Sequence, residues 1–331
     1  MRLCYPAYFT EFRCVAAACP DSCCKEWDVA VDPEAAARYQ AMPGALGEAL
    51  RQHMYWEDGD CYFRNINGRC PMWRQDGLCR IQAELGHDAL CMTCRDFPRL
   101  THDFGDFVER GLELSCPEAA KLILSANGVW VQQECPGGET PEYDGEAMAV
   151  LLRTRAVALR LLEQERSANE SLAILMLYGY HAQAELDGGE VLPFDPDAAL
   201  TEAGEFAKDG NIEELLDFFQ GLEILSQTWP ARLNHPQPGQ WVPMHRNLAR
   251  YFVERYWLQA VSDYDLVGRV KLAVISCLVI WALGGDLVQT AQAYSKEIEN
   301  DADNVEAILD GAYADPALTD QKILSLLLQN S

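Results

Sequence analysis

Cysteine is the residue type whose number and spacing point most directly to chemistry in this chain. Three groups follow one another: Cys14, Cys19, Cys23 and Cys24 in FRCVAAACPDSCCKEW, Cys70 and Cys79 in CPMWRQDGLC, and Cys91, Cys94 and then Cys116 in LCMTCRDFPR and LSCPEAAKLI. Two thiolates separated by two residues can bind one metal, because the turn between them directs both sulfur atoms inward. Soft thiolate ligands select zinc, copper(I) or iron–sulfur clusters. The pattern therefore predicts a metal or cluster site.

Disulfide bonds and redox-active thiols are the alternatives to a metal site. The chain holds thirteen cysteines, an odd number, and its start, MRLCYPAYFTEFRC, lacks the apolar region of a secretory signal. Both observations favour a cytoplasmic protein with reduced thiols. A zinc ribbon would carry two C-x-x-C pairs, whereas Cys91 and Cys94 form one pair, and no βαβ unit of the thioredoxin type surrounds it. More thiols are present than one zinc ion uses, which favours an iron–sulfur cluster, with zinc as the alternative.

The rest of the sequence shows which elements must position these thiols. Twelve of the thirteen cysteines lie within residues 1–135, and Cys277 alone lies beyond, in the apolar run VKLAVISCLVIWAL. The stretch ECPGGETPEYDGE is typical of a linker or a long loop. We therefore predict a mainly α protein with two parts. An irregular cysteine-rich region that binds a metal or cluster, residues 1–135, would pack on an all-helical region, residues 136–331.

Hydrophobic periodicity predicts the helices. Segments such as AMAVLLRTRAVALRLLEQE and NIEELLDFFQGLEILSQTW have apolar residues at helical spacing, and Asn211 is a candidate N-cap for the second. In the cysteine-rich region we expect short helices at Pro33–Gln40, Leu46–Trp56 and Pro117–Ala126. Small β elements or loops are expected at VAVD, CYFRNINGRC and DFGDFVERG. No long run alternates between apolar and polar residues as a strand would.

The charge of the chain excludes some partners. Its 51 acidic and 26 basic residues give a formal net charge of −25. A surface of this sign repels nucleic acid and disfavours anionic membranes, whereas it attracts a lysine-rich protein. The apolar run Val270–Leu283 carries Lys271 and is too short to span a bilayer, so we expect a buried helix and no membrane contact. Cys277 in this run is then expected to be an inert core thiol.

The cysteine motifs also resemble those of a known family. FRCVAAACPDSCCKEW, CPMWRQDGLCRIQAELG, LCMTCRDFPR and LSCPEAAKLIL are similar to the flagellin lysine N-methylase family of the FliB type, which has an N-terminal zinc- or iron-chelating cysteine-cluster domain. YFVERYWLQAVSDYDLVGRVKLAVISCLVIWAL and AYSKEIENDADNVEAIL resemble the C-terminal half of that family. The resemblance implies an S-adenosylmethionine-dependent protein-lysine N-methyltransferase that acts on flagellin and carries a [4Fe–4S] cluster. The alternative function is a non-enzymatic zinc- or iron-binding protein that recruits a partner.

The resemblance further implies site residues. By motif, the metal-ligand candidates are nine cysteines: Cys14, Cys19, Cys23, Cys24, Cys70, Cys79, Cys91, Cys94 and Cys116. Nine thiols exceed the four that one cubane cluster needs, so either two centres exist or some of these thiols have other roles. Cys4, Cys61 and Cys135 fall outside the motifs. In CRDFPR, Arg95 and Arg99 are candidates for binding the carboxylate of the methyl donor, with a structural ion pair as the alternative.

Methyl transfer to lysine makes demands of its own. The ammonium group must lose a proton, the reacting atoms must align, and aromatic walls suit the cation. The aromatic candidates, each of which has a core or surface role as its alternative, are Trp27, Trp56, Tyr62, Trp73, Tyr251, Tyr256 and Trp257. The segment SKEIEN, with Lys296, Glu297 and Glu299, is either part of an active site or interface or a solvated helix end. No strand followed by a Gly-rich turn is found, so a Rossmann-like donor site is not expected, and no catalytic residue is assigned.

Overall fold

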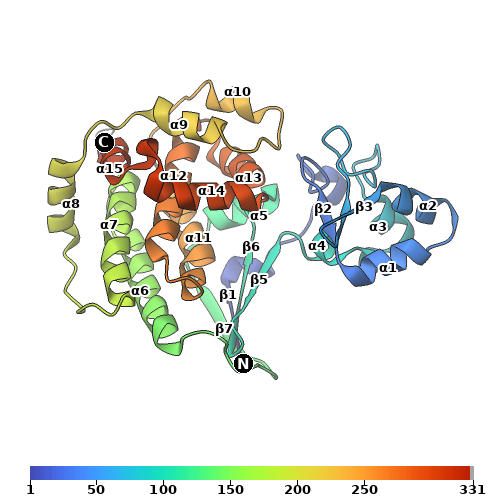
Figure 1. The fold of residues 1–331 in the computed structure, drawn as a ribbon, viewed down its shortest axis with the longest axis horizontal. Helices are drawn as coiled ribbons and strands as arrows, with labels where there is room; N and C mark the ends of the chain where they lie inside the picture. Colours follow the sequence, from blue (N-terminus) through green and yellow to red (C-terminus); the bar gives the residue numbers. More distant parts are fainter. Residues whose placement is uncertain (329–331) are drawn as a thin grey trace.

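The chain folds into two lobes of unequal size (Figure 1). The computed structural model describes residues 1–328. The larger lobe contains most of the helices and a four-stranded sheet, and the smaller lobe contains a three-stranded sheet with short helices around it. Helices make up 56% of the chain, which confirms the prediction of a mainly α protein.

The sheet of the larger lobe is assembled from distant parts of the sequence. Its strands are β1 (Arg2–Pro6), β5 (Arg99–Asp103), β6 (Phe107–Leu112) and β7 (Trp130–Glu134), in the order β5-β6-β1-β7. β1 runs parallel to β6, with Arg2 opposite Phe107, and antiparallel to β7. The small β elements expected in the cysteine-rich region included neither β1 nor β7. Each is five residues long, too short to show an alternating pattern, and each is stabilised by partners far along the chain.

The smaller lobe is an insertion between β1 and β5. It contains β2 (Val29–Val31), β3 (Met54–Glu57), β4 (Asp60–Phe63), α1 (Pro33–Ala41), α2 (Gly44–His53), α3 (Arg80–Leu85) and α4 (Met92–Asp96). Its own hydrophobic core runs from Val29 to Cys91 and centres on Tyr39, Leu50 and Phe63. The two ends of the insertion meet, because the Arg99 guanidinium lies 5.1 Å above the ring of Phe12.

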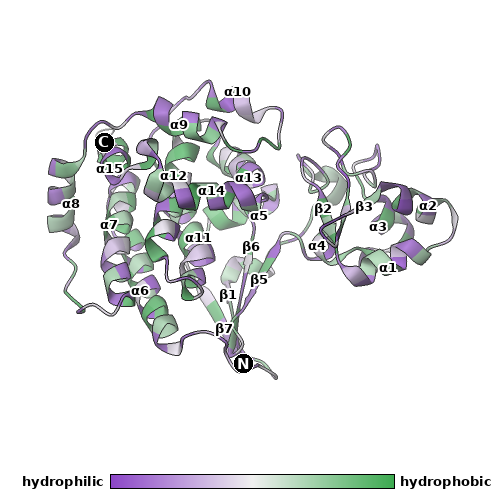
Figure 2. Cartoon of the chain, in the orientation of Figure 1, coloured by the Kyte–Doolittle hydropathy of each residue, from purple (hydrophilic) through white to green (hydrophobic). Residues whose placement is uncertain are grey.

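The larger lobe is a stack of helices. They are α5 (Pro117–Leu124), α6 (Gly145–Glu163), α7 (Ala168–Leu186), α8 (Pro196–Phe206), α9 (Ile212–Gln220), α10 (Trp229–Leu233), α11 (Met244–Tyr256), α12 (Leu266–Leu283), α13 (Leu287–Ile298), α14 (Ala302–Ala314) and α15 (Asp320–Leu328). Short 3-10 turns lie at Ala7–Thr10, Ala16–Ala18, His87–Ala89, Trp257–Val261 and Pro316–Leu318. Side-chain caps fix where several helices begin; Asn211, as predicted, caps α9 by accepting from the backbone N–H groups of Glu213 and Glu214. Figure 2 shows hydrophobic and hydrophilic residues alternating along α6, as expected of a helix with one face in the core.

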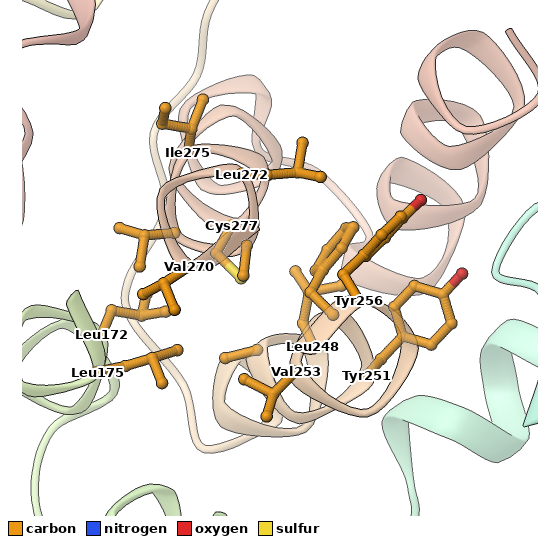
Figure 3. Packing of buried hydrophobic residues seen from close by; sticks show 14 of the residues in the cluster. Leu172, Leu175, Leu248, Tyr251, Val253, Tyr256, Val270, Leu272, Ile275 and Cys277 are labelled. Atoms are coloured by element: carbon orange, nitrogen blue, oxygen red, sulfur yellow. The ribbon is translucent and has the colours of Figure 1, made fainter. Parts of the chain in front are cut away.

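Helix α12 is the centre of the larger lobe. All of its residues from Leu266 to Leu283 are buried, and it contacts α7, α11 and α14. By length and composition it is the one helix within residues 1–328 that could cross a membrane, yet it is wholly covered by the protein. Figure 3 shows Cys277 of α12 facing the apolar side chains of α11. The prediction of a buried core helix is confirmed, although the helix begins four residues before the apolar run.

Other sequence-based expectations can be compared with these elements. The three short helices predicted in the cysteine-rich region correspond to α1, α2 and α5, although α2 ends at His53 where β3 begins. Residues 136–328 contain helices, turns and loops but no strand. The sequence places the boundary between the two parts at residue 135, whereas the two hydrophobic cores are separated at other positions along the chain. Phe12 and the β6 residues Phe107 and Leu112 belong to the core of the helices, whereas the buried residues of the separate cluster lie within residues 29–91.

Candidate functional site

Six of the predicted ligand cysteines gather in the smaller lobe, and we call them the lobe thiols. They are Cys23, Cys24, Cys70, Cys79, Cys91 and Cys94. Three hydrogen-bonded pairs connect neighbours: Cys23 with Cys24, Cys24 with Cys70, and Cys91 with Cys94. The backbone brings the first and second sequence groups together, since the N–H of Cys70 donates to the carbonyl of Cys24 at 2.8 Å.

Hydrogen bonding and burial keep most of the lobe thiols protonated. The hydrogen bond with Cys94 holds the pKa of Cys91 below its ordinary value, and the same bond raises the pKa of Cys94. Although the bond with Cys23 lowers the pKa of Cys24, its bond with Cys70 and burial raise that pKa to about 12. A metal that binds here must therefore displace protons, so its affinity depends on pH.

Helix N-termini point at three of the nine candidate thiols. Cys79, Cys91 and Cys116 are the residues immediately before α3, α4 and α5, respectively. Burial raises the pKa of Cys116 to about 11, but backbone N–H groups of Glu118 and Ala119 act in the opposite direction. The free N–H groups and the positive end of a helix favour a thiolate. The spacing of the cysteines does not reveal this feature.

The remaining three candidate cysteines form a second group at the junction of the lobes. The charges of Cys14 and Cys19 raise the pKa of Cys116, so these three side chains lie near one another. Cys23 connects the two groups, because it affects the pKa of Cys19 as well as that of Cys79. The nine cysteines thus fall into two neighbouring groups.

No preformed metal site is seen in either group. Within residues 1–328, no three His, Cys, Asp or Glu side chains are arranged to hold one metal ion, and all thirteen cysteines are free thiols. Of the cysteines outside the motifs, Cys61 on β4 lies close enough to Cys91 for the latter's charge to raise its pKa, so the structure brings it near the lobe thiols. Cys277 lies in the core, where burial raises its pKa.

A cavity of about 570 Å³ opens between the lobes, and we call it the interlobe pocket. Its main lining residues are Phe9, Trp27, Met92, Thr93, Asp96, Phe97, Arg99, Arg110, Glu113, Glu299 and Asn300. Met92 and Thr93 lie in the sequence between Cys91 and Cys94, so one wall of the pocket is the helix α4, which contains Cys94 and directly follows Cys91. A pocket of this volume is in the range of small-molecule binding sites.

Buried polar groups form the wall of the interlobe pocket on the side of the larger lobe. The Glu299 carboxylate, whose side chain is 2% exposed, accepts hydrogen bonds from the hydroxyl groups of Tyr256 at 2.8 Å and Tyr251 at 3.1 Å. The Nε of Arg255 lies 3.3 Å from the same carboxylate. Figure 3 shows both tyrosine rings leaving α11 with their hydroxyl oxygens directed away from Cys277 and the apolar cluster. Burial raises the pKa of the neighbouring carboxyl of Glu113, against the effect of Arg255.

A second polar contact joins the lobes three residues before Glu299. Lys296 Nζ lies 2.9 Å from Asp21 Oδ2 and 3.0 Å from Glu26 Oε2, and both carboxylates belong to the cysteine-rich segment that includes Cys23 and Cys24. Gln292 Nε2 also donates to Asp21 at 2.9 Å. We call this contact the Lys296 clasp. The segment SKEIEN is therefore a buried lobe interface and pocket wall, and the alternative of a solvated helix end is wrong.

The predicted donor-binding arginines and aromatic residues take different positions. Arg99 lines the interlobe pocket, whereas Arg95 lies outside its lining and pairs with Asp96 at 3.3 Å. Trp27 lines the pocket, and its Nε1 donates to the carbonyl of Cys23 at 2.8 Å. The remaining aromatic candidates are Tyr251 and Tyr256 behind Glu299, Trp257 in the core, and Trp56, Tyr62 and Trp73 in the smaller lobe.

Sequence reasoning missed Arg110, Glu113 and Asn300. No motif marks them, because Arg110 is on strand β6, Glu113 is in the turn before α5, and Asn300 follows α13. The folding of β5 against β6 and the docking of α13 on α5 bring them to one cavity. The polar or charged type of each residue was visible in the sequence, but their proximity was not.

The chain is similar in sequence to known proteins over 36% of its length. The chain is 35% identical over 129 residues to the flagellar biosynthetic protein FliU of Salmonella muenchen, an alignment that covers 36% of this chain and 75% of FliU. It is 34% identical over 129 residues to the lysine-N-methylases of Salmonella typhimurium and Salmonella choleraesuis, covering 36% of this chain and 32% of each relative. No family model and no solved structure matches the chain. The match thus spans about a third of the lysine-N-methylases.

Proposed function

Because the chain belongs to the family of FliU and the lysine-N-methylases, we propose that it is a protein-lysine N-methyltransferase that uses S-adenosylmethionine and acts on flagellin. The observation that carries the proposal is the alignment with proteins named lysine-N-methylase and flagellar biosynthetic protein. The interlobe pocket supports it, since its aromatic and charged walls come from both lobes. The formal charge of −25 suits a substrate that presents lysine side chains.

The proposal includes a [4Fe–4S] cluster held by cysteines. A cubane cluster takes four thiolates, and the lobe thiols supply six free sulfur atoms that already influence one another. The lobe thiols therefore match a cubane cluster in donor type and number, although they are not arranged as ligands of one centre in this structure. Zinc is the alternative ion, since it takes the same donor atoms. When bound, a cluster supplies a redox-active iron centre and fixes the smaller lobe, which is rich in turns and loops.

The protein's own residues meet the other requirements of methyl transfer. The lysine amine must be neutral to attack the methyl group, and the reacting atoms must be held in line. The carboxylate of Glu299 can bind the ammonium or receive its proton, and Trp27 and Phe97 provide an aromatic wall. The lobes exclude water from the pocket wall, where the Glu299 side chain is 2% exposed.

Anaerobic purification followed by metal analysis and a methyl-transfer assay tests the proposal. We expect a brown protein with iron and sulfide, and transfer of isotope-labelled methyl groups from S-adenosylmethionine to lysines of flagellin. Cys24→Ser should lose iron, whereas Cys135→Ser, a control outside the motifs, should retain it. Folded protein with zinc alone would refute the iron–sulfur cluster. Iron-loaded protein that leaves every flagellin lysine unmethylated would refute the substrate.

A further inference from the structure

The interlobe pocket has the chemical character of a site for a zwitterion with an extra positive charge. Arg99 and Arg110 bring two guanidinium groups to its lining. Asp96, Glu113 and Glu299 bring three carboxylates, of which Asp96 is paired with Arg95 at 3.3 Å. Within residues 1–328, neither guanidinium forms an ion pair, so both are available to an anionic group of a ligand. A guanidinium binds a carboxylate through two parallel hydrogen bonds.

The carboxylates occupy different environments. Glu299 is tied to Tyr251, Tyr256 and Arg255, so its charge is already shared with a cation. Among residues 1–328, the one hydrogen-bond donor to Glu113 is the Ser115 hydroxyl, at 3.1 Å. A buried carboxylate with one weak donor gains more from a cationic ligand than one that is already paired. Glu113 is therefore the residue that would distinguish a cationic from a neutral ligand.

Aromatic surfaces complete the pocket. Trp27 and Phe97 face each other with ring centroids 6.3 Å apart, and Phe9 adds a third ring to the lining. Flat aromatic rings stack on purine bases without demanding particular hydrogen bonds. Trp27 is fixed by its hydrogen bond to the carbonyl of Cys23, so the position of this wall depends on the segment that carries the lobe thiols.

We propose that the interlobe pocket is the S-adenosylmethionine site, in which Arg99 and Arg110 bind the carboxylate, Trp27 and Phe97 contact the adenine, and Glu113 faces the sulfonium. This assignment rests on the proposed function for the identity of the donor. It places the methyl group beside the wall formed by Glu299 and its tyrosines, where an incoming lysine amine would meet carboxylate oxygens. Arg95, the other arginine of CRDFPR, lies outside the lining and takes no part.

Binding measured by calorimetry without any protein substrate tests the assignment. The two probes are S-adenosylmethionine and S-adenosylhomocysteine, which differ in the sulfonium charge. Arg110→Met should weaken both probes by about tenfold or more, because it removes the carboxylate partner. Glu113→Gln should weaken S-adenosylmethionine by about tenfold and leave S-adenosylhomocysteine nearly unchanged. Arg38→Met and Glu34→Gln, a surface pair on α1 with N···O at 2.9 Å, serve as matched controls that should bind both probes as the unchanged protein does.

The outcomes separate this inference from the proposed function. Methyl transfer by a protein whose Arg110→Met and Glu113→Gln variants bind both probes normally would overturn the donor site and leave the function standing. The selective binding pattern in a protein that methylates no lysine would support the site and refute the function. Equal loss of both probes in Glu113→Gln, with near-native circular dichroism, would overturn the sulfonium contact.

Discussion

Replacement of Lys296 by methionine tests the contact between the lobes. Lys296 is 7% exposed in its side chain and neutralises Asp21 and Glu26, which are 22% and 31% exposed. Lys296→Met keeps most of the buried methylene groups but removes the positive charge that both carboxylates share. Asp21 retains Lys25 Nζ at 3.1 Å and the amide of Gln292, so its carboxylate is not left without donors.

The expected loss of unfolding free energy in Lys296→Met depends on how far water reaches the three side chains. Removing one partner of a fully buried ion pair costs about 3–5 kcal/mol of unfolding free energy. Because water reaches the two carboxylates, we discount this figure and expect a loss of about 2 kcal/mol at neutral pH. Burial opposes the ionisation of Asp21, but Lys296, together with Lys25 and the backbone N–H of Ser22, holds the pKa of that carboxyl below its ordinary value. The stabilisation is therefore complete above the unfolded-state pKa of about 4 and is lost as the pH falls further, so the difference between variant and unchanged protein should shrink there.

Urea unfolding followed by circular dichroism gives the measurement. The control is Lys322→Met, which breaks the pair with Glu214 whose side chains are 21% and 47% exposed. We expect the control to lose less than about 1 kcal/mol of unfolding free energy. Cleavage by a protease in the segment 13–28 should also accelerate in Lys296→Met alone. A Lys296→Met protein no less stable than the Lys322→Met protein would show that the clasp does not hold the lobes together.

Two further predictions concern other buried charges. Burial raises the pKa of Glu297 to about 7, so near neutral pH the native protein holds a proton that the unfolded chain releases. The unfolding free energy should therefore fall as the pH rises from about 5 to about 8. Urea titrations at several pH values should show that Glu297→Gln removes this slope, and a slope that persists in the variant would refute the assignment. Arg155 donates to both oxygens of Glu109 at 2.7 and 2.5 Å, and the two side chains are 11% and 7% exposed. Arg155→Met should therefore lower the unfolding free energy by about 3 kcal/mol, and adding Glu109→Gln should restore part of that loss. Strictly additive losses in the double variant would contradict the pairing.

Local signals in the sequence predicted the helices well. The N-cap Asn211 and the apolar run of α12 are local features, and both appear in the structure where the residues placed them. The strands β1 and β7 escaped prediction because their stability comes from pairing with each other and with β6, not from their own pattern. The sequence also did not show that the smaller lobe is an insertion, because this depends on where the chain leaves the larger lobe, after Phe12, and where it returns, at Arg99.

The candidate site was predictable in part. Cysteine spacing indicated which thiols belong together, and the structure gathers six of the nine in one lobe. The pocket beside them was not predictable, since Arg110, Glu113 and Glu299 come from three segments that share no motif. Trp27 was one of seven aromatic candidates that the sequence could not rank. Its hydrogen bond to the Cys23 carbonyl and its place in the pocket lining separate it from the others.

The insertion of the smaller lobe has a consequence for the order of folding during synthesis. The strand β1 is made first, but its two neighbours β6 and β7 begin at Phe107 and Trp130. By the time Phe107 is added, all six lobe thiols and their own hydrophobic core are present in the nascent chain, whereas β1 still has no partner in its sheet. The smaller lobe can thus fold, and acquire whatever ion its thiols bind, before the larger lobe closes around the first strand.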